Sequence, residues 1–130
     1  MKKLVVIDAC IRGEESRTRR IAAPIIERLA GRYEISFFHL TEMPMEPLSP
    51  RTYADRTVGI VPDWAVQAAK TVAEADRILI AAPFWDMSFP AVLKTFIEHI
   101  SLFDITFTDN GRSCVGLCKC EKVMYITDRK

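Results

Sequence analysis

The sequence carries almost no net charge of either sign. Its 130 residues hold 18 lysines and arginines against 17 aspartates and glutamates, a formal charge of +1, and the basic residues are spread along the chain. No basic stripe is present that could neutralise nucleic-acid phosphates. No apolar run approaches the roughly 18 residues that span a bilayer, and the N-terminal run is too short for a signal peptide. We therefore expect a cytoplasmic protein without a nucleic-acid or membrane partner.

Paired cysteine motifs are also missing. Cys10 stands alone, and Cys114, Cys118 and Cys120 follow a Cys-x3-Cys-x-Cys spacing rather than the Cys-x2-Cys pairs of zinc sites. A chain with 49% hydrophobic residues can build its own core, so it needs no disulfide framework. We expect free cysteines, no metal, and one globular domain over residues 1–130.

Short apolar runs alternate with helical patterns along the chain. The runs KLVVID, YEISFFHL, RILIAAP and KVMYIT predict strands at residues 3–8, 33–40, 77–83 and 122–127. Apolar residues at helical spacing predict helices at about 18–30, 62–75 and 90–101, and weakly at 51–59. Pro24 should kink the first helix or delay its start. Strands joined by helices require crossovers, so we predict an α/β fold with an open parallel sheet and helices on both faces.

The fourth predicted strand is apolar, and nothing follows it except Asp128, Arg129 and Lys130. Such a strand would leave an uncovered sheet edge. The pattern therefore favours either a chain that is incomplete at its C-terminus or a second chain that covers the edge.

Three loops reach the carboxyl ends of the strands, where open parallel sheets bind their ligands: residues 9–17, 82–88 and 128 onward. The first loop contains neither the Gly-x-Gly-x-x-Gly dinucleotide motif nor the Gly-x4-Gly-Lys-Ser/Thr triphosphate motif. It does place Ser16, Arg17 and Thr18 at a helix start, where two hydroxyls, a cation and free N–H groups suit one phosphate monoester. The alternative is that Ser16 or Thr18 only caps the helix.

The second loop, within AAPFWDMSFP, is unusually apolar for a connection. Phe84 and Trp85 could simply be core or dimer-interface residues. Beside Ser16, Arg17 and Thr18, which we call the phosphate cradle, they also offer a surface on which a wide aromatic ring system can stack. A phosphate cradle and an aromatic surface at the same end of one sheet indicate flavin mononucleotide (FMN).

The chain resembles the flavodoxin-like quinone and azo reductases of the FMN-dependent NADH-azoreductase type. The resemblance covers nearly the whole chain and is most specific in AAPFWDMSFPAVLKTFIEHI, with further matches in SRT, DITFTDNG and GLCKCEK. It implies a homodimer that passes two electrons from NADH or NADPH to quinones, azo compounds or similar acceptors in a ping-pong reaction. The flavin would carry the chemistry without a catalytic side chain.

The resemblance also implies roles for individual residues. Phosphate and ribityl contacts would come from Cys10, Ser16, Arg17 and Thr18, and ring contacts from Pro83, Phe84, Trp85, Asp86 and Met87. Thr127, Asp128 and Arg129 would face the pyrimidine edge, while Ile105 and Phe107 would line the substrate side. The two rivals are a flavodoxin-type carrier that passes single electrons to a protein, and a truncated relic that no longer holds flavin.

The sequence departs from the family pattern in three places. Cys10 stands where a serine is usual, and Asp86 stands where the family has asparagine. A carboxylate near the ring should oppose negative charge on reduced flavin, so we expect a lowered reduction potential. Asp128, Arg129 and Lys130 replace an Arg-Gly-Gly loop, and the last helix and fifth strand of the family are missing.

Overall fold

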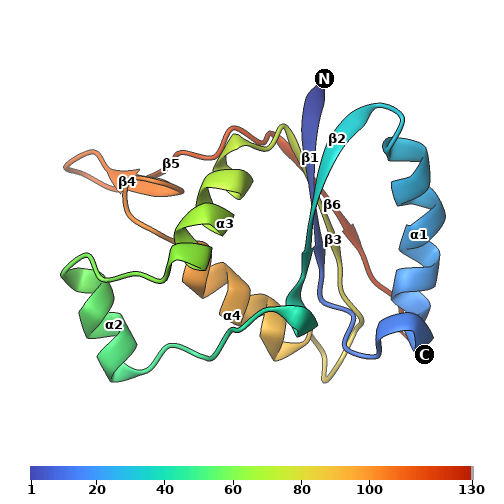
Figure 1. Ribbon diagram of the computed structural model, residues 1–130, viewed down its shortest axis with the longest axis horizontal. Helices are drawn as coiled ribbons and strands as arrows, with labels where there is room; N and C mark the ends of the chain where they lie inside the picture. The colour runs from blue at the N-terminus through green and yellow to red at the C-terminus, as the bar shows by residue number, and fades with distance from the viewer. Residues whose placement is uncertain (130) are drawn as a thin grey trace.

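Four parallel strands form the central sheet in the order β2, β1, β3, β6 (Figure 1). They are β1 (Lys2–Asp8), β2 (Tyr33–His39), β3 (Arg77–Ala81) and β6 (Lys122–Ile126). The computed structural model describes residues 1–129, so Lys130 of the C-terminal departure lies outside the described residues. The predicted α/β fold with a parallel sheet is confirmed, and the strands end within two residues of the predicted positions.

The parallel pairing brings the carboxyl ends of the strands together. Asp8 at the end of β1 lies opposite His39 of β2 and Ala81 of β3. Ala81 in turn lies opposite Ile126 at the end of β6. The loops that follow β1, β3 and β6 therefore leave the sheet at the same end, which is where such sheets bind ligands.

Helices cover both faces of the sheet. α1 (Arg17–Leu29) packs on one face, and α3 (Asp63–Glu74) and α4 (Ala91–Ile100) pack on the other (Figure 1). Side chains of β1 alternate between two cores, with Leu4 and Val6 on the α1 side and Val5 and Ile7 on the α3 and α4 side. Burial on both faces explains why β1 reads as a continuous apolar run.

The first helix tolerates its internal proline. α1 begins at Arg17 and continues through Pro24, so the alternative of a late start is wrong. Pro24 is exposed, and the carbonyl that loses its partner N–H can be hydrated on that side of the helix. The helix therefore presents its N-terminus at the position that the phosphate-cradle hypothesis requires.

Three elements lie apart from the sheet. α2 (Pro50–Thr57) begins at a capping box in which Ser49 and Thr52 each bond the other's backbone N–H. β4 (Phe107–Asp109) and β5 (Cys114–Gly116) form a short antiparallel hairpin beyond α3 and α4 (Figure 1). No strand was predicted here, because two strands of three mostly exposed residues show no usable alternation.

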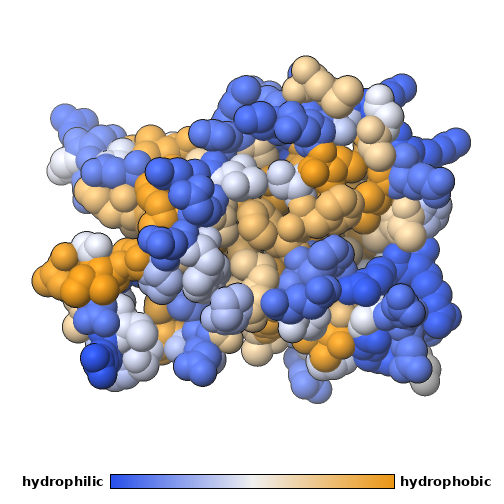
Figure 2. Space-filling model, viewed as in Figure 1, coloured by the Kyte–Doolittle hydropathy of each residue, from blue (hydrophilic) through white to orange (hydrophobic). Residues whose placement is uncertain are grey.

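Apolar side chains remain exposed at the sheet edge and near α2. Val123, Met124 and Tyr125 of β6 are all about half exposed. Figure 2 shows another apolar group on the surface beside α2, where Val58 and Ile60 are exposed. Within residues 1–129, no helix has both the length and the apolar character that crossing a membrane requires.

Candidate functional site

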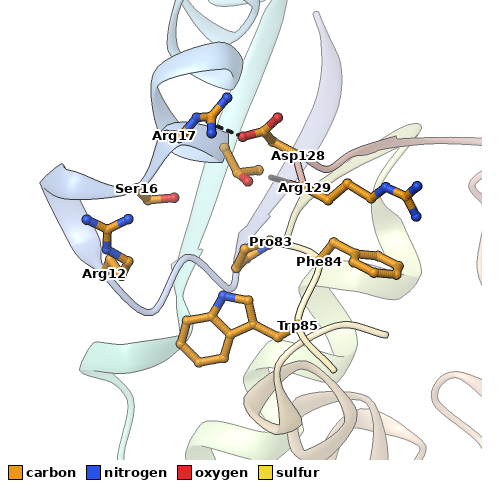
Figure 3. Close-up of a pocket in the computed structure, with 9 residues that line it drawn as sticks. Arg12, Ser16, Arg17, Pro83, Phe84, Trp85, Asp128 and Arg129 are labelled. Atoms are coloured by element: carbon orange, nitrogen blue, oxygen red, sulfur yellow. Dashed lines mark ion pairs between the residues drawn. The ribbon is translucent and has the colours of Figure 1, made fainter. Parts of the chain in front are cut away.

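The loops after β1, β3 and β6 enclose a cavity of about 280 Å³ at the carboxyl end of the sheet (Figure 3). Its walls come from all three loops: Arg12, Ser16, Arg17, Thr18, Pro83, Phe84, Trp85, Asp128 and Arg129. One side of the cavity is cationic and lies at the N-terminus of α1, and the other is aromatic. The structure thus brings together eight of the residues predicted to bind the cofactor, six from the first and second loops and two from the third. The predicted residues Cys10, Asp86, Met87 and Thr127 do not line this cavity.

Ser16 organises the cationic side. Its hydroxyl oxygen accepts a hydrogen bond from the Arg19 N–H at 3.2 Å, so the predicted helix cap is present. The N–H groups of Arg17 and Thr18 belong to the first turn, where no intrahelical partner exists. They carry the positive end of the helix dipole, and Arg12 and Arg17 add two guanidinium groups. Ser16 can therefore cap the helix while the N–H groups of the same first turn remain free to bind a phosphate.

Arg12 is a cavity residue that sequence reasoning missed. It precedes a 3-10 turn at Gly13–Glu15 that reverses the loop, where Gly13 has a φ of 62°. A left-handed backbone at this position favours glycine. The signal available in the sequence was a second arginine four residues before Ser16, beside that glycine.

The aromatic side rests on a tight turn after β3. The N–H of Trp85 donates to the Ser88 carbonyl and the N–H of Ser88 donates to the Trp85 carbonyl, both at 2.9 Å. The two central residues, Asp86 and Met87, have φ values of 48° and 67°. This is the geometry of a two-residue hairpin turn, which normally carries Asn-Gly. The turn directs Trp85 into the cavity and turns Asp86 and Met87 away, so these two do not line it.

Met87→Gly should stabilise the folded chain by about 0.5–1 kcal/mol, because glycine adopts a positive φ without strain. The Met87 side chain is 82% exposed, so little packing is lost. Chemical denaturation measures the change. Ser88→Gly, outside the positive-φ positions, should be neutral or destabilising, and equal stabilisation by both variants would contradict the strain argument.

The third loop is tied to the other two. Asp128 forms an ion pair with Arg17, with 3.1 Å between Oδ2 and Nε, and its carbonyl accepts from the Phe84 N–H at 3.2 Å. The Arg129 guanidinium lies over the Phe84 ring, 5.5 Å from its centroid. These contacts join the cationic and aromatic sides of the cavity at its rim.

A buried carboxylate lies behind the first loop. Asp8, at the end of β1, is 6% exposed. Its Oδ1 accepts from the Cys10 N–H at 2.9 Å, and its Oδ2 lies 2.6 Å from Arg19 Nη2 and 3.0 Å from His39 Nδ1. Burial alone would raise the pKa of Asp8, but hydrogen bonds from Cys10 and His39 and the Arg19 charge outweigh it and hold the pKa below its ordinary value. One carboxylate therefore fixes both ends of the loop that carries the cradle.

His39 has a partner that the sequence did not suggest. The sequence offers His39 no obvious carboxylate partner, and the structure places its Nδ1 3.0 Å from Asp8 Oδ2. His99 is buried, and its Nε2 lies 2.6 Å from the Glu46 carbonyl oxygen, so its ring has a hydrogen-bond partner. Neither histidine lines the cavity.

Cys10 lies beneath the loop and does not line the cavity. It is fully buried, and its thiol donates to the Ala81 carbonyl at 3.6 Å. Burial, together with the nearby Asp8 charge, raises the pKa of Cys10 to about 11. Its predicted contact with a cofactor phosphate stays a prediction, and its observed contact is with strand β3.

Cys10 should therefore react with Ellman's reagent at least a hundredfold more slowly than the exposed thiols of Cys114 and Cys118. Stopped-flow measurement on the native chain at neutral pH, followed by unfolding in denaturant, separates the classes. Cys10→Ser should leave the fast phase unchanged. Equal reaction of all thiols before unfolding would contradict the buried placement.

The remaining predicted residues lie elsewhere. Thr127 is exposed between β6 and the ion-paired Asp128. Ile105 packs against the core on the α4 side, and Phe107 packs edge-to-face with Phe103 at a centroid distance of 5.8 Å. Neither Ile105 nor Phe107 lines the cavity, so the structure does not bring the predicted substrate side to the predicted flavin side within this chain.

Sequence comparison finds relatives of this chain. A family described by its flavodoxin-like fold matches residues 2–129. A Bradyrhizobium protein named FMN-dependent NADH:quinone oxidoreductase is 33% identical over 137 aligned positions, covering 98% of this chain and 68% of the relative. FMN-dependent NADH:quinone oxidoreductase 2 of Clostridium acetobutylicum is 49% identical over 57 residues, which are 44% of this chain and 28% of that protein. The chain thus matches less than a third of the length of this clostridial relative.

Solved structures show the same fold. An azoreductase from Bacillus anthracis superposes with a TM-score of 0.78 at 18% identity, covering 96% of this chain and 67% of that one. An FMN-dependent NADH-azoreductase from the same species, in complex with FMN, gives 0.74 at 15% identity and covers 98% and 68%. The family match over residues 2–129 and the Bradyrhizobium relative show that the chain belongs to the flavodoxin-like family of FMN-dependent NADH:quinone oxidoreductases.

Proposed function

We propose that this chain binds FMN in the cavity between α1 and the loop after β3, and that it passes two electrons from NADH or NADPH to quinones, azo compounds or similar acceptors. The observation that carries the proposal is the meeting of a cationic helix N-terminus and an aromatic surface in one cavity. The names of the relatives and of the FMN-bound azoreductase support the same cofactor and reaction class.

The cavity residues divide the work of holding the cofactor. The N–H groups of Arg17 and Thr18 and the guanidinium groups of Arg12 and Arg17 would bind the phosphate. Phe84 and Trp85 would pack against the ring and exclude water from one of its faces. When bound, the flavin supplies the hydride and electron chemistry, so no side chain has to act as nucleophile or base.

The finer features of the proposal follow the family. We propose a ping-pong exchange in which donor and acceptor use one slot in turn, and a cytoplasmic homodimer. Exposed apolar residues on β6, and a second apolar group beside α2 (Figure 2), are consistent with an interface. A second subunit would also supply the substrate side that Ile105 and Phe107 do not form within one chain.

Anaerobic half-reactions test the proposal. NADH or NADPH should bleach the visible absorption of the FMN-loaded chain, and a quinone or an azo dye should restore it. Initial rates at several fixed acceptor concentrations should give parallel double-reciprocal lines. If neither NADH nor NADPH reduces the FMN-loaded chain, the proposed reductase activity is wrong. Electron transfer to a protein acceptor alone would favour the single-electron carrier.

Asp86→Asn should raise the midpoint potential of bound FMN. Removal of the Asp86 charge makes negative charge on the reduced ring less unfavourable. Because Asp86 is exposed in the turn beside Trp85, solvent screens this interaction and the effect is small. We expect a rise of about 10–30 mV, where 30 mV is about 1.4 kcal/mol for two electrons. Equilibration with a reference dye measures it. Glu14→Gln, which removes a similar exposed charge from the first loop, is the control, and no rise in Asp86→Asn would refute the electrostatic effect.

A further inference from the structure

A carboxylate already occupies the cationic side of the cavity. Asp128 Oδ2 lies 3.1 Å from Arg17 Nε, and the pair closes the cavity opposite Trp85 (Figure 3). We propose that Asp128 is a specificity-determining residue, an internal counterion that an incoming phosphate has to displace from Arg17. The inference rests on the proposed function, because it concerns how strongly that site prefers phosphorylated flavin.

The structure holds the Asp128 carboxylate in place. Its side chain is 20% exposed, against 54% for Arg17. Its backbone carbonyl accepts from the Phe84 N–H at 3.2 Å, and the next residue, Arg129, lies over the Phe84 ring. The loop is therefore anchored to Phe84 at Asp128 and at the residue that follows it, which keeps the carboxylate at the cavity instead of letting it move into solvent.

Asp128 and a phosphate would compete for the same groups. Arg17 is the first residue of α1, so the carboxylate that pairs with it also lies in the field of the helix N-terminus. The other cavity cations are engaged less directly, since Arg12 is 4.0 Å from the exposed Glu15 and Arg129 lies on Phe84. A phosphate dianion at this helix start would meet a fixed like charge, which lowers its affinity.

The expected consequence is selective for the phosphate group. The ring and ribityl chain of riboflavin carry no charge, so Asp128 should not oppose them. FMN adds a dianion that must break or share the Arg17 pair. Asp128 therefore narrows the difference in affinity between FMN and riboflavin, and its removal should widen that difference.

Asp128→Asn tests this with little change in shape. Dissociation constants for FMN and riboflavin are measured by quenching of flavin fluorescence at low ionic strength. We expect the variant to bind FMN about tenfold more tightly and riboflavin within twofold of the wild-type value. Glu14→Gln removes one exposed negative charge from the first loop, where Glu14 forms no ion pair with Arg17, and it should change FMN affinity less than twofold.

Arg17→Gln in both backgrounds separates competition from general electrostatics. If Asp128 acts through Arg17, the tenfold gain from Asp128→Asn should disappear when Arg17 is glutamine. Persistence of the full gain would contradict the proposed pairing. An unchanged or lower FMN affinity in Asp128→Asn would overturn the proposal outright. The carboxylate would then either have no effect on FMN affinity or position Arg17 for the phosphate.

Binding of inorganic phosphate tests the role of Asp128 without flavin. Titration calorimetry should show tighter phosphate binding to Asp128→Asn than to the wild type. If neither flavin binds the wild type while phosphate binds the variant more tightly, the proposed function fails and the counterion role stands. If FMN binds the wild type and neither FMN nor phosphate distinguishes the variant, the counterion role alone is wrong.

Discussion

Asp8→Ala is expected to lower the free energy of unfolding by about 2–3 kcal/mol. The change leaves Arg19 without its 2.6 Å partner and the Cys10 N–H without an acceptor. Loss of one partner of a buried ion pair usually costs about 3–5 kcal/mol. We expect less here, because the Arg19 side chain is 30% exposed and water can reach it. Denaturation in urea, followed by circular dichroism, measures the difference.

A matched control lies on the neighbouring strand. Glu34 is an exposed acid on β2 that forms no ion pair within the described residues, so Glu34→Ala should change stability by less than about 0.5 kcal/mol. Asp8→Asn, which can still accept from the Cys10 N–H, should lose less stability than Asp8→Ala. Equal, small losses in Asp8→Ala and Glu34→Ala would show that the carboxylate does not organise the loop.

The same carboxylate sets a pH dependence. Its pKa is lower in the folded chain than in the unfolded one, so the ionised form stabilises the fold. This stabilisation is complete above the unfolded pKa of about 4 and is lost as pH falls through that value toward the folded pKa. The wild type should lose its stability advantage over Asp8→Asn below about pH 4, and a constant difference down to pH 2 would contradict the assignment.

Trp85→Ala is expected to weaken flavin binding by about tenfold to a hundredfold, for FMN and riboflavin alike. The indole lies across the cavity from Arg12 and Ser16 (Figure 3) and is 40% exposed without ligand. Removal of a stacked aromatic side chain costs about 1–3 kcal/mol in comparable base-stacking sites. Because the side chain is not part of the core, stability should change little.

Two variants sharpen the test of the aromatic side. Trp85→Phe keeps a ring and should recover most of the affinity. Tyr53→Ala removes an exposed aromatic from α2, outside the cavity, and should leave flavin binding unchanged. If Trp85→Ala binds riboflavin as tightly as the wild type does, the flavin ring does not stack on this residue.

The sequence predicted the scaffold well because its signals are local. The apolar run before Asp8 reflects burial of β1 on both faces, and the helical spacing from Ala22 to Leu29 reflects burial of one face of α1, so periodicity was enough to find both elements. Ser16 at the helix start likewise follows from capping chemistry. The placement of loops at the carboxyl ends then follows from parallel topology alone.

Contacts between distant residues could not be predicted in the same way. Asp8 meets His39 because two strand ends align, and it meets Arg19 because α1 packs on that face. The turn at Asp86 and Met87 lacks the Asn-Gly signature of its geometry, so the direction of these two side chains was not visible. Ile97 belongs to the apolar positions at helical spacing that predicted the helix at 90–101, yet it is 37% exposed.

The most direct test of the account is whether the chain retains FMN. The purified protein is incubated with FMN and desalted, and its visible spectrum is compared with its protein absorbance. The account predicts a retained flavin band at about one FMN per chain, lost on addition of excess competing FMN analogue and reduced in Trp85→Ala. A colourless protein whose circular dichroism shows the intact α/β fold would contradict it, because the cavity would then be formed without binding the cofactor.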